Sequence, residues 1–307
     1  MALSVASVIL TAVFVFGSAS SWKYPDNEGN GWSGLCRNGT EQSPIDILYG
    51  DKGVTTPVSY EPLVFVNYDS LVNYNVTNNG HTAVLTAQNT CAVYISGGGL
   101  RKLYKLEQMH FHWGSEHLVN GQRFALELHL VHYDANYASL QEALGKNNSL
   151  AVIAVLFRQD KSDLPNIELK HVTSGLRAVT EPGRTAQLAA RFSPGSLLPT
   201  DTERWWRYAG SLTTPGCDQG VVWTVFRDTL PLARDQIKEF QQLLMHSAGP
   251  SSSAEFMLKN FRAPQPVKQR AVYYQDPVEH TKCGAAVGSA PLAVLAVLLA
   301  CVVLGRS

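Results

Sequence analysis

The chain has no charge imbalance. Its 307 residues include 25 Lys and Arg and 25 Asp and Glu, so the formal net charge is zero with neutral histidines. The sequence has no basic stripe, which argues against a nucleic-acid partner. It has no acidic tail, which argues against a charged solvating segment. Internal repeats and low-complexity segments are also absent. Ordinary apolar content and this length predict one globular domain of about 250 residues with a processing signal at each end.

Cysteine is scarce. Of the five cysteines, Cys301 lies in a C-terminal apolar stretch and Cys283 lies at its border. The body of the chain therefore contains Cys36, Cys91 and Cys217, which is an odd number. One disulfide and one leftover thiol is the simplest account, and the residues alone do not say which two pair.

The N-terminal segment, residues 1–21, lacks Lys and Arg. It is apolar from Ala2 to Phe16 and then small at Gly17, Ser18 and Ala19, which is typical of a secretory signal peptide. A membrane helix is the alternative, but the apolar run is shorter than the ~20 residues that a spanning helix needs.

The C-terminal segment, residues 284–307, is uncharged up to Leu304. Small residues followed by a Leu/Val-rich run are typical of a GPI-attachment signal, which is removed on processing. A retained membrane anchor is the alternative, although several basic residues would usually follow it and only Arg306 does. Residues 273–283 form the predicted stalk. We therefore expect the secretory pathway, the extracellular face of the plasma membrane, and N-glycans at the three sequons of Asn38, Asn75 and Asn147.

Short β-branched segments dominate the body of the chain, as at 63–66, 151–157 and 221–226, and Gly, Pro, Asn and Asp punctuate them. The pattern predicts a mainly β (α+β) domain over residues 22–272, with a large, mostly antiparallel twisted central sheet and short peripheral helices. Apolar spacing predicts helices over 235–247 and 162–179.

Two histidine patterns point to a metal. In a strand, His110 and His112 face the same side, about 7 Å apart at the backbone, while the residues between and beside them face the other way. In a second strand Glu127 and His129 share one face. A turn-rich connection over 114–124 lets the two strands pair, which brings His129 beside the other two histidines.

Three neutral imidazoles with an open fourth position are typical of catalytic zinc. A structural zinc site would usually be closed by four protein ligands, and no cysteine flanks these histidines. Two surface histidines on an edge strand are the alternative for His110 and His112 alone. The Glu127 carboxylate on the ligand face argues against it, because its burial is explained by pairing with a ligand histidine.

Several motifs together resemble the alpha-class carbonic anhydrases. They occur in order at residues 42–47, 78–81, 108–114, 115–117, 127–132, 211–215 and 260–262. The similarity extends from about Trp22 to about Arg270, and the ends and cysteines look like the membrane-anchored extracellular group. It implies reversible hydration of carbon dioxide to bicarbonate on Zn²⁺, and inhibition by sulfonamides.

The resemblance also implies a role for each residue. His110, His112 and His129 would bind zinc. Gln108 would orient His110, Glu127 would orient His129, and the backbone of Asn260 would hold His112. Thr213 would donate a hydrogen bond to Glu116 and orient the nucleophile, and Thr214 would line the bicarbonate position. His81 would be the proton shuttle, with Tyr24 and Asn79 ordering the connecting waters. The carbon dioxide wall would comprise Val131, Val152, Leu212, Val221 and Trp223.

Some features depart from the family pattern or leave alternatives. The bridge implied by the family is Cys36–Cys217, which leaves Cys91 free or paired with Cys283 or another chain. Val84 stands where a polar, water-ordering residue is frequent. An acatalytic binding module and a zinc esterase are the competing functions. Such modules typically lack a ligand histidine, and a zinc protease helix with the H-E-x-x-H pattern is absent from the sequence. The sequence does not indicate an oligomeric state.

Overall fold

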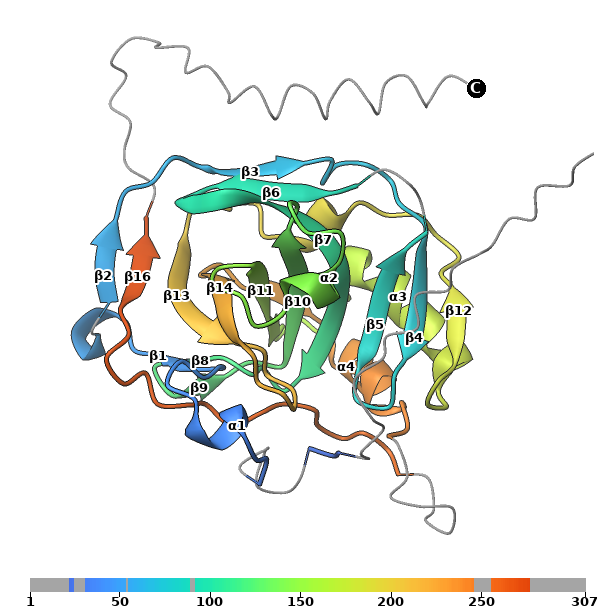
Figure 1. Cartoon of the computed structure of the whole chain (residues 1–307). Helices are drawn as coiled ribbons and strands as arrows, with labels where there is room; N and C mark the ends of the chain where they lie inside the picture. The colour runs from blue at the N-terminus through green and yellow to red at the C-terminus, as the bar shows by residue number, and fades with distance from the viewer. Residues whose placement is uncertain (1–21, 25–30, 54, 89–91, 246–254, 277–307) are drawn as a thin grey trace, which may run out of the picture.

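The computed structural model describes residues 22–276, except 25–30, 54, 89–91 and 246–254. The predicted signal peptide and the predicted GPI-attachment segment lie outside these residues, and so does Cys91. The described residues form one domain around a large twisted sheet, with short helices at its periphery (Figure 1). The predicted fold class is thus confirmed. Within the described part of the chain, no helix has both the length and the apolarity to cross a membrane.

The main sheet has thirteen strands, ten of which follow the order β12-β4-β5-β7-β10-β11-β14-β13-β16-β2. Most neighbours are antiparallel, whereas β14 and β15 pair with β11 and β16 pairs with β2 in parallel. The strands of this sheet are β2 (Thr55–Val58), β3 (Leu63–Val66), β4 (Tyr74–Asn78), β5 (Ala83–Ala87), β6 (Tyr94–Gly97), β7 (Leu100–Trp113), β10 (Leu126–Asp134), β11 (Leu150–Gln159), β12 (Thr185–Gln187), β13 (Trp205–Ser211), β14 (Gln219–Phe226), β15 (Leu230–Leu232) and β16 (Val272–Gln275). A smaller sheet comprises β1 (Asp46–Ile47), β8 (Leu118–Val119) and β9 (Gln122–Arg123).

Two central strands separate the two apolar cores. On β7, Met109, Phe111 and Trp113 enter one core, while His110 and His112 face the other way. All nine residues of β10 are buried, because β7 and β11 flank it and both of its faces are covered. The leucines of β10 join the first core, and Val131 belongs to the second. Strand alternation therefore places the histidines on the face of the second core.

The helices are shorter than predicted. α3 (Ile167–Leu176) begins after Asn166, whose Oδ1 accepts a hydrogen bond from the backbone of Leu169 at 2.9 Å. A 3₁₀ turn at Arg177–Val179 continues it to the predicted end. α4 (Arg234–Gln241) ends well before the predicted residue 247. The remaining helical elements are α1 (Leu35–Asn38), α2 (Leu140–Ala143) and 3₁₀ turns at Gly50–Lys52 and Pro194–Leu197.

The error in α4 has a physical reason. Leu243 and Leu244 are buried, as their apolar spacing suggested, but they follow the helix, and Leu244 forms a β-bridge with Phe256. Burial alone produces such spacing in irregular chain. The end of the domain also differs from its predicted boundary at residue 272. Tyr273 pairs with Arg207 of β13 and with Thr56 of β2, so residues 273–275 belong to the sheet rather than to a stalk.

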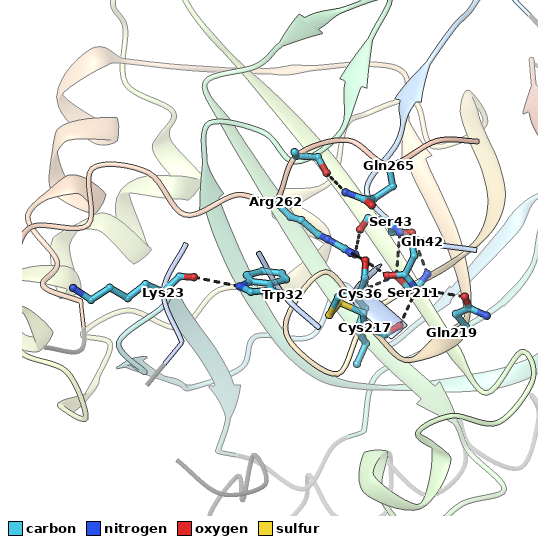
Figure 2. The surroundings of a disulfide bond; sticks show 12 residues. Lys23, Trp32, Cys36, Gln42, Ser43, Ser211, Cys217, Gln219, Arg262 and Gln265 are labelled. Atoms are coloured by element: carbon cyan, nitrogen blue, oxygen red, sulfur yellow. Dashed lines mark hydrogen bonds between the residues drawn. A yellow bond between two sulfur atoms is a disulfide. The ribbon is translucent and has the colours of Figure 1, made fainter. Parts of the chain in front are cut away.

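A disulfide ties remote parts of the chain together (Figure 2). Cys36 and Cys217, 181 residues apart, are bonded, which confirms the implied bridge. Next to it, the buried Arg262 donates to the carbonyls of Ser43 at 2.7 Å and Cys36 at 2.7 Å. The backbone of Cys217 donates to the Thr214 carbonyl at 2.9 Å. In the chain-entropy model, closing so long a loop stabilises the fold by about 5 kcal/mol, and here the closed loop ends beside Thr214.

Candidate metal centre

The three predicted histidines come together on the face of β7 and β10. His129 stands opposite His110 in the antiparallel register, and Glu127 stands opposite His112. The ring centroid of His110 lies 5.0 Å from the ring centroids of His112 and His129, and those two centroids are 4.6 Å apart. One ligand nitrogen from each ring lies within 4.8 Å of the other two. This spacing allows all three to bind a single ion.

The other nitrogen of each ring is held by a hydrogen-bond acceptor. Nδ1 of His110 donates to Oε1 of Gln108 at 2.9 Å, and Nδ1 of His112 donates to the carbonyl of Asn260 at 2.7 Å. Nε2 of His129 donates to Oε1 of Glu127 at 2.6 Å. Since these acceptors fix the tautomer, each ring presents a lone pair on its remaining nitrogen. These are the three bonds that the resemblance implied for Gln108, Glu127 and Asn260.

The converging lone pairs fit a divalent cation. Nε2 of His112 is buried and has no hydrogen-bond partner, which is costly unless something else contacts it. Nε2 of His110 and Nδ1 of His129 are 3.2 Å apart. Neither atom carries a proton, because the proton of each ring is on the nitrogen that donates to Gln108 or Glu127, so these two atoms cannot form a hydrogen bond with each other. A cation between them turns this repulsion into attraction. Three neutral imidazoles suit Zn²⁺, and they leave its fourth position open.

The electrostatic surroundings favour the neutral rings that a metal requires. Burial, followed by the proximity of His112 and His129, lowers the pKa of His110 well below its usual value. Burial also lowers the pKa of His112. For Glu127, burial acts to raise the pKa, but His117 and His129 outweigh it and hold the pKa well below its usual value. Glu127 is therefore a carboxylate, which makes His129 a better electron donor.

A second group on the same face comprises His117, Glu127 and His129. Here Nδ1 of His117 and Nε2 of His129 each lie 2.6 Å from Oε1 of Glu127, which is a hydrogen-bond distance. Nε2 of His117 lies 2.7 Å from the hydroxyl of Tyr208. Both ring nitrogens of His117 are thus engaged, so this group supports the first one and does not form a separate metal site.

Sequence reasoning assigned no role to His117. It is fully buried, and its backbone N–H donates to Oε2 of Glu127 at 2.8 Å, in addition to the ring contact. His117 lies in the connection before β8, where no strand or helix periodicity signals burial. Only its place in the quoted motif at 115–117 could have drawn attention to it.

Glu116 is buried beside the histidines. Its Oε1 accepts from the backbone N–H of Arg262 at 2.9 Å, and its Oε2 lies 3.5 Å from Nε2 of His112. The implied hydrogen bond from Thr213 is not formed in this structure, and Oε2 of Glu116 has no hydrogen-bond partner. Thr213 is itself buried in the turn after β13, and Thr214 is half-buried beside it.

The predicted apolar wall is contiguous. Val131 of β10 stands opposite Val152 of β11, which stands opposite Trp223 of β14. These three belong to the second core together with Val221, and Leu212 packs against it. The Trp223 ring centroid lies 4.8 Å from that of His129. A dry surface therefore adjoins the histidine cluster.

His81 lies on a turn that joins β4 and β5. Oδ1 of Asn79 accepts from the backbones of His81 at 2.9 Å and Thr82 at 2.8 Å, so this atom holds the turn. The His81 ring stacks on Trp22, with centroids 3.7 Å apart. Trp22 also contacts Tyr24 edge-on at 5.1 Å. Sequence reasoning missed Trp22, which no local pattern singles out.

The turn is connected to His112. The side chain of Asn260 donates to the His81 carbonyl at 3.0 Å, while the carbonyl of Asn260 accepts from His112. Burial, followed by the charge of Glu116, raises the pKa of Tyr24 well above its usual value. Tyr24 is therefore a neutral phenol that can donate or accept a hydrogen bond.

We expect the Glu127→Gln variant to bind Zn²⁺ about 10- to 100-fold more weakly, because a neutral amide holds and polarises His129 less well. Competition with a chromophoric chelator measures the change. Glu203→Gln, which alters an exposed carboxylate, is the matched control and should bind as tightly as the wild type. Unchanged affinity in Glu127→Gln would show that the carboxylate does not support the metal ligands.

Comparisons with known proteins agree with the geometry. The family model for eukaryotic-type carbonic anhydrase matches residues 23–276. Carbonic anhydrase 15 of Mus musculus is 34% identical over 275 residues, which cover 83% of each chain. Carbonic anhydrase 7 of Homo sapiens is 36% identical over 82% of this chain and 96% of its own. Carbonic anhydrase 12 of Homo sapiens is 36% identical over 83% of this chain and 73% of its own.

Proposed function

This chain belongs to the eukaryotic-type carbonic anhydrase family, and we propose that it is a zinc enzyme that reversibly hydrates carbon dioxide at the extracellular membrane surface. Family membership implies carbon dioxide and bicarbonate as substrates and sulfonamides as inhibitors. The observation that carries the proposal is the convergence of three ring nitrogens whose opposite nitrogens are all held by acceptors.

His110, His112 and His129 would hold Zn²⁺, which would supply the Lewis acidity that makes water a nucleophile near neutral pH; carbonic anhydrase is itself the standard example of this chemistry. Neutral imidazoles suit this task, because they leave the full charge on the ion. Glu127, Gln108 and Asn260 keep the ligand rings in the required orientation. The protein thereby contributes a preorganised arrangement of the three rings.

The neighbouring side chains position the reactants. The unpartnered Oε2 of Glu116 is available to accept a hydrogen bond from the hydroxyl of Thr213, which in turn accepts one from the nucleophile. That arrangement aims a lone pair at the substrate. Val131, Val152 and Trp223 offer an apolar surface on which a nonpolar gas displaces water at little cost. Thr214 lines the position of the product bicarbonate.

Each turnover releases a proton that must reach bulk buffer. We assign its transfer to His81, since imidazole has an unperturbed pKa near about 6.5 and exchanges protons readily at neutral pH. The stacking contact with Trp22 gives the ring a defined resting position. Val84 lies directly opposite His110 on β5, so this part of the wall offers no side-chain hydrogen bond to relay water.

Two rival functions are weaker. An acatalytic binding module has no need of a complete ligand set, and this chain keeps all three histidines together with their acceptors. A zinc esterase would use the same centre, so ester cleavage is expected at most as a side activity. Zinc content and carbon dioxide hydration together distinguish these cases.

We expect the purified protein with one bound Zn²⁺ to hydrate carbon dioxide in a stopped-flow assay, and a chelator to abolish the activity. Thr213→Ala should lower kcat/KM by about 100-fold, as for the loss of one hydrogen-bonding group that stabilises the transition state, while zinc stays bound. Thr56→Ala on the edge strand β2 is the control. Full activity of the metal-free protein would refute a zinc mechanism, and zinc loss in Thr213→Ala would make Thr213 a structural residue.

We expect His81→Ala to slow turnover at least about tenfold in weak buffer, and added imidazole to restore it. Activity in strong buffer should change little, because buffer then takes the proton directly. His171→Ala on α3 is the matched control, since this histidine also stacks on an aromatic ring, that of Phe192. If His81→Ala keeps the wild-type rate in weak buffer, the shuttle is another group.

The disulfide and the apolar ends support a secretory route, because disulfides persist in oxidising compartments. We propose that residues 1–21 are removed as a signal peptide and that 284–307 are exchanged for a GPI anchor. Phosphatidylinositol-specific phospholipase should then release the protein from the surface of expressing cells. Retention after complete enzyme treatment would favour a membrane-spanning anchor instead.

A further inference from the structure

The face of the sheet that carries the three histidines extends to the edge strand β12. His110 stands opposite Val84, Val84 opposite Thr77, and Thr77 opposite Thr185. Side chains directly opposite one another in antiparallel strands point to the same side. We call this side, defined by Thr185, Thr77, Val84 and His110, the histidine face.

Asn75 also lies on the histidine face, because it is two residues from Thr77 on β4. It stands opposite Thr86 of β5 and opposite Gln187 of β12. Gln108, which holds the ring of His110, occupies the corresponding position on β7. From strand rise and strand spacing, the Cα atoms of Asn75 and His110 are separated by about 12 Å.

The two faces of these strands differ in exposure. Val76, Leu85 and Met109 on the opposite face are fully buried in the first core. Asn75, Thr77 and His110 on the histidine face are half-exposed. Any group attached to Asn75 must therefore extend from the histidine face, because the other side of the strand offers no room.

The side chain of Asn75 is oriented for such an attachment. Its Oδ1 accepts a hydrogen bond from Nε2 of Gln88. Within the described residues its Nδ2, the atom that an N-glycan modifies, makes no hydrogen bond. The following residues Val76 and Thr77 complete an acceptor sequon. The backbone holds this sequon inside a strand and not in a loop, which fixes the direction of any sugar.

We propose that Asn75 carries an N-linked glycan that stands on the histidine face and restricts large ligands from the metal centre while admitting carbon dioxide. A glycan is bulky and hydrated, so it excludes other molecules by volume. A gas of three atoms passes such a layer, whereas a ligand attached to a polymer does not. This proposal rests on the secretory route proposed above, since glycan transfer requires it.

The sequon at Asn147 provides an internal comparison. Asn147 is exposed in the turn that precedes β11. Ala154 of β11 stands opposite His129, so the first residues of this strand separate Asn147 from the metal centre. A glycan there should leave access to the metal unchanged. Asn38 is exposed at the end of α1, close to the disulfide.

The test uses the full chain secreted from mammalian cells. Glycopeptide mass spectrometry measures the occupancy of Asn75 directly. Two probes then report access to the metal: benzenesulfonamide, and the same group tethered to dextran. Asn75→Gln and Asn147→Gln each remove one sequon. Thr77→Ser keeps the sequon of Asn75 and keeps a hydroxyl that faces Thr185.

We expect an occupied Asn75, and at least tenfold tighter binding of the tethered probe to Asn75→Gln than to the wild type. Binding of the free probe should be equal in all variants, and Thr77→Ser and Asn147→Gln should behave as the wild type. An unmodified Asn75, or equal binding of the tethered probe to the wild type and Asn75→Gln, overturns the proposal.

Failure of the proposed function would look different. In that case neither carbon dioxide hydration nor binding of free sulfonamide would occur in any variant, including the one without the glycan. Glycan occupancy would still be decided by mass spectrometry. Extraction of bound Zn²⁺ by a free and by a dextran-tethered chelator would then measure access, with the same expected difference between the wild type and Asn75→Gln.

Discussion

The hydrogen bonds behind the three histidines are the interactions on which the rest of the site depends. A neutral imidazole can bind a metal through either nitrogen, so a cluster of rings is a site only if one nitrogen of each is committed elsewhere. Gln108, Asn260 and Glu127 make that commitment with an amide, a backbone carbonyl and a carboxylate. The remaining nitrogens repel one another without a cation, and the buried Nε2 of His112 has no hydrogen-bond partner.

These acceptors come from different parts of the chain, which explains why so much of the fold surrounds the site. Gln108 and Glu127 lie on the same strands as the ligands that they hold. Asn260 lies in irregular chain near the C-terminal end of the domain, and Arg262 beside it is bonded to the carbonyls of Cys36 and Ser43. The disulfide from Cys36 then reaches the turn with Thr213 and Thr214. The three histidines and the turn that carries Thr213 and Thr214 are thus held by one connected network.

Strand alternation separates the tasks of the central sheet. On β7 and β10, one face supplies a dry core and the other presents the histidines and Glu127. The same alternation continues to β4, where it directs Asn75 onto the face of the metal ligands. The strand geometry that positions the histidines therefore also determines where Asn75 stands relative to them.

Much of this was available from the sequence, because it depends on local periodicity and on side-chain chemistry. The shared face of His110 and His112, the pairing with His129 and the β-rich fold follow from alternation and residue type. Other features depend on which distant segments meet. Packing alone decided that Leu243 and Leu244 follow the helix, that residues 273–275 complete the sheet, and that Trp22 stacks on His81. It also brought His117 onto Glu127. Such contacts leave no trace in neighbouring residues, since burial across a sheet constrains a side chain through partners that are remote in the chain.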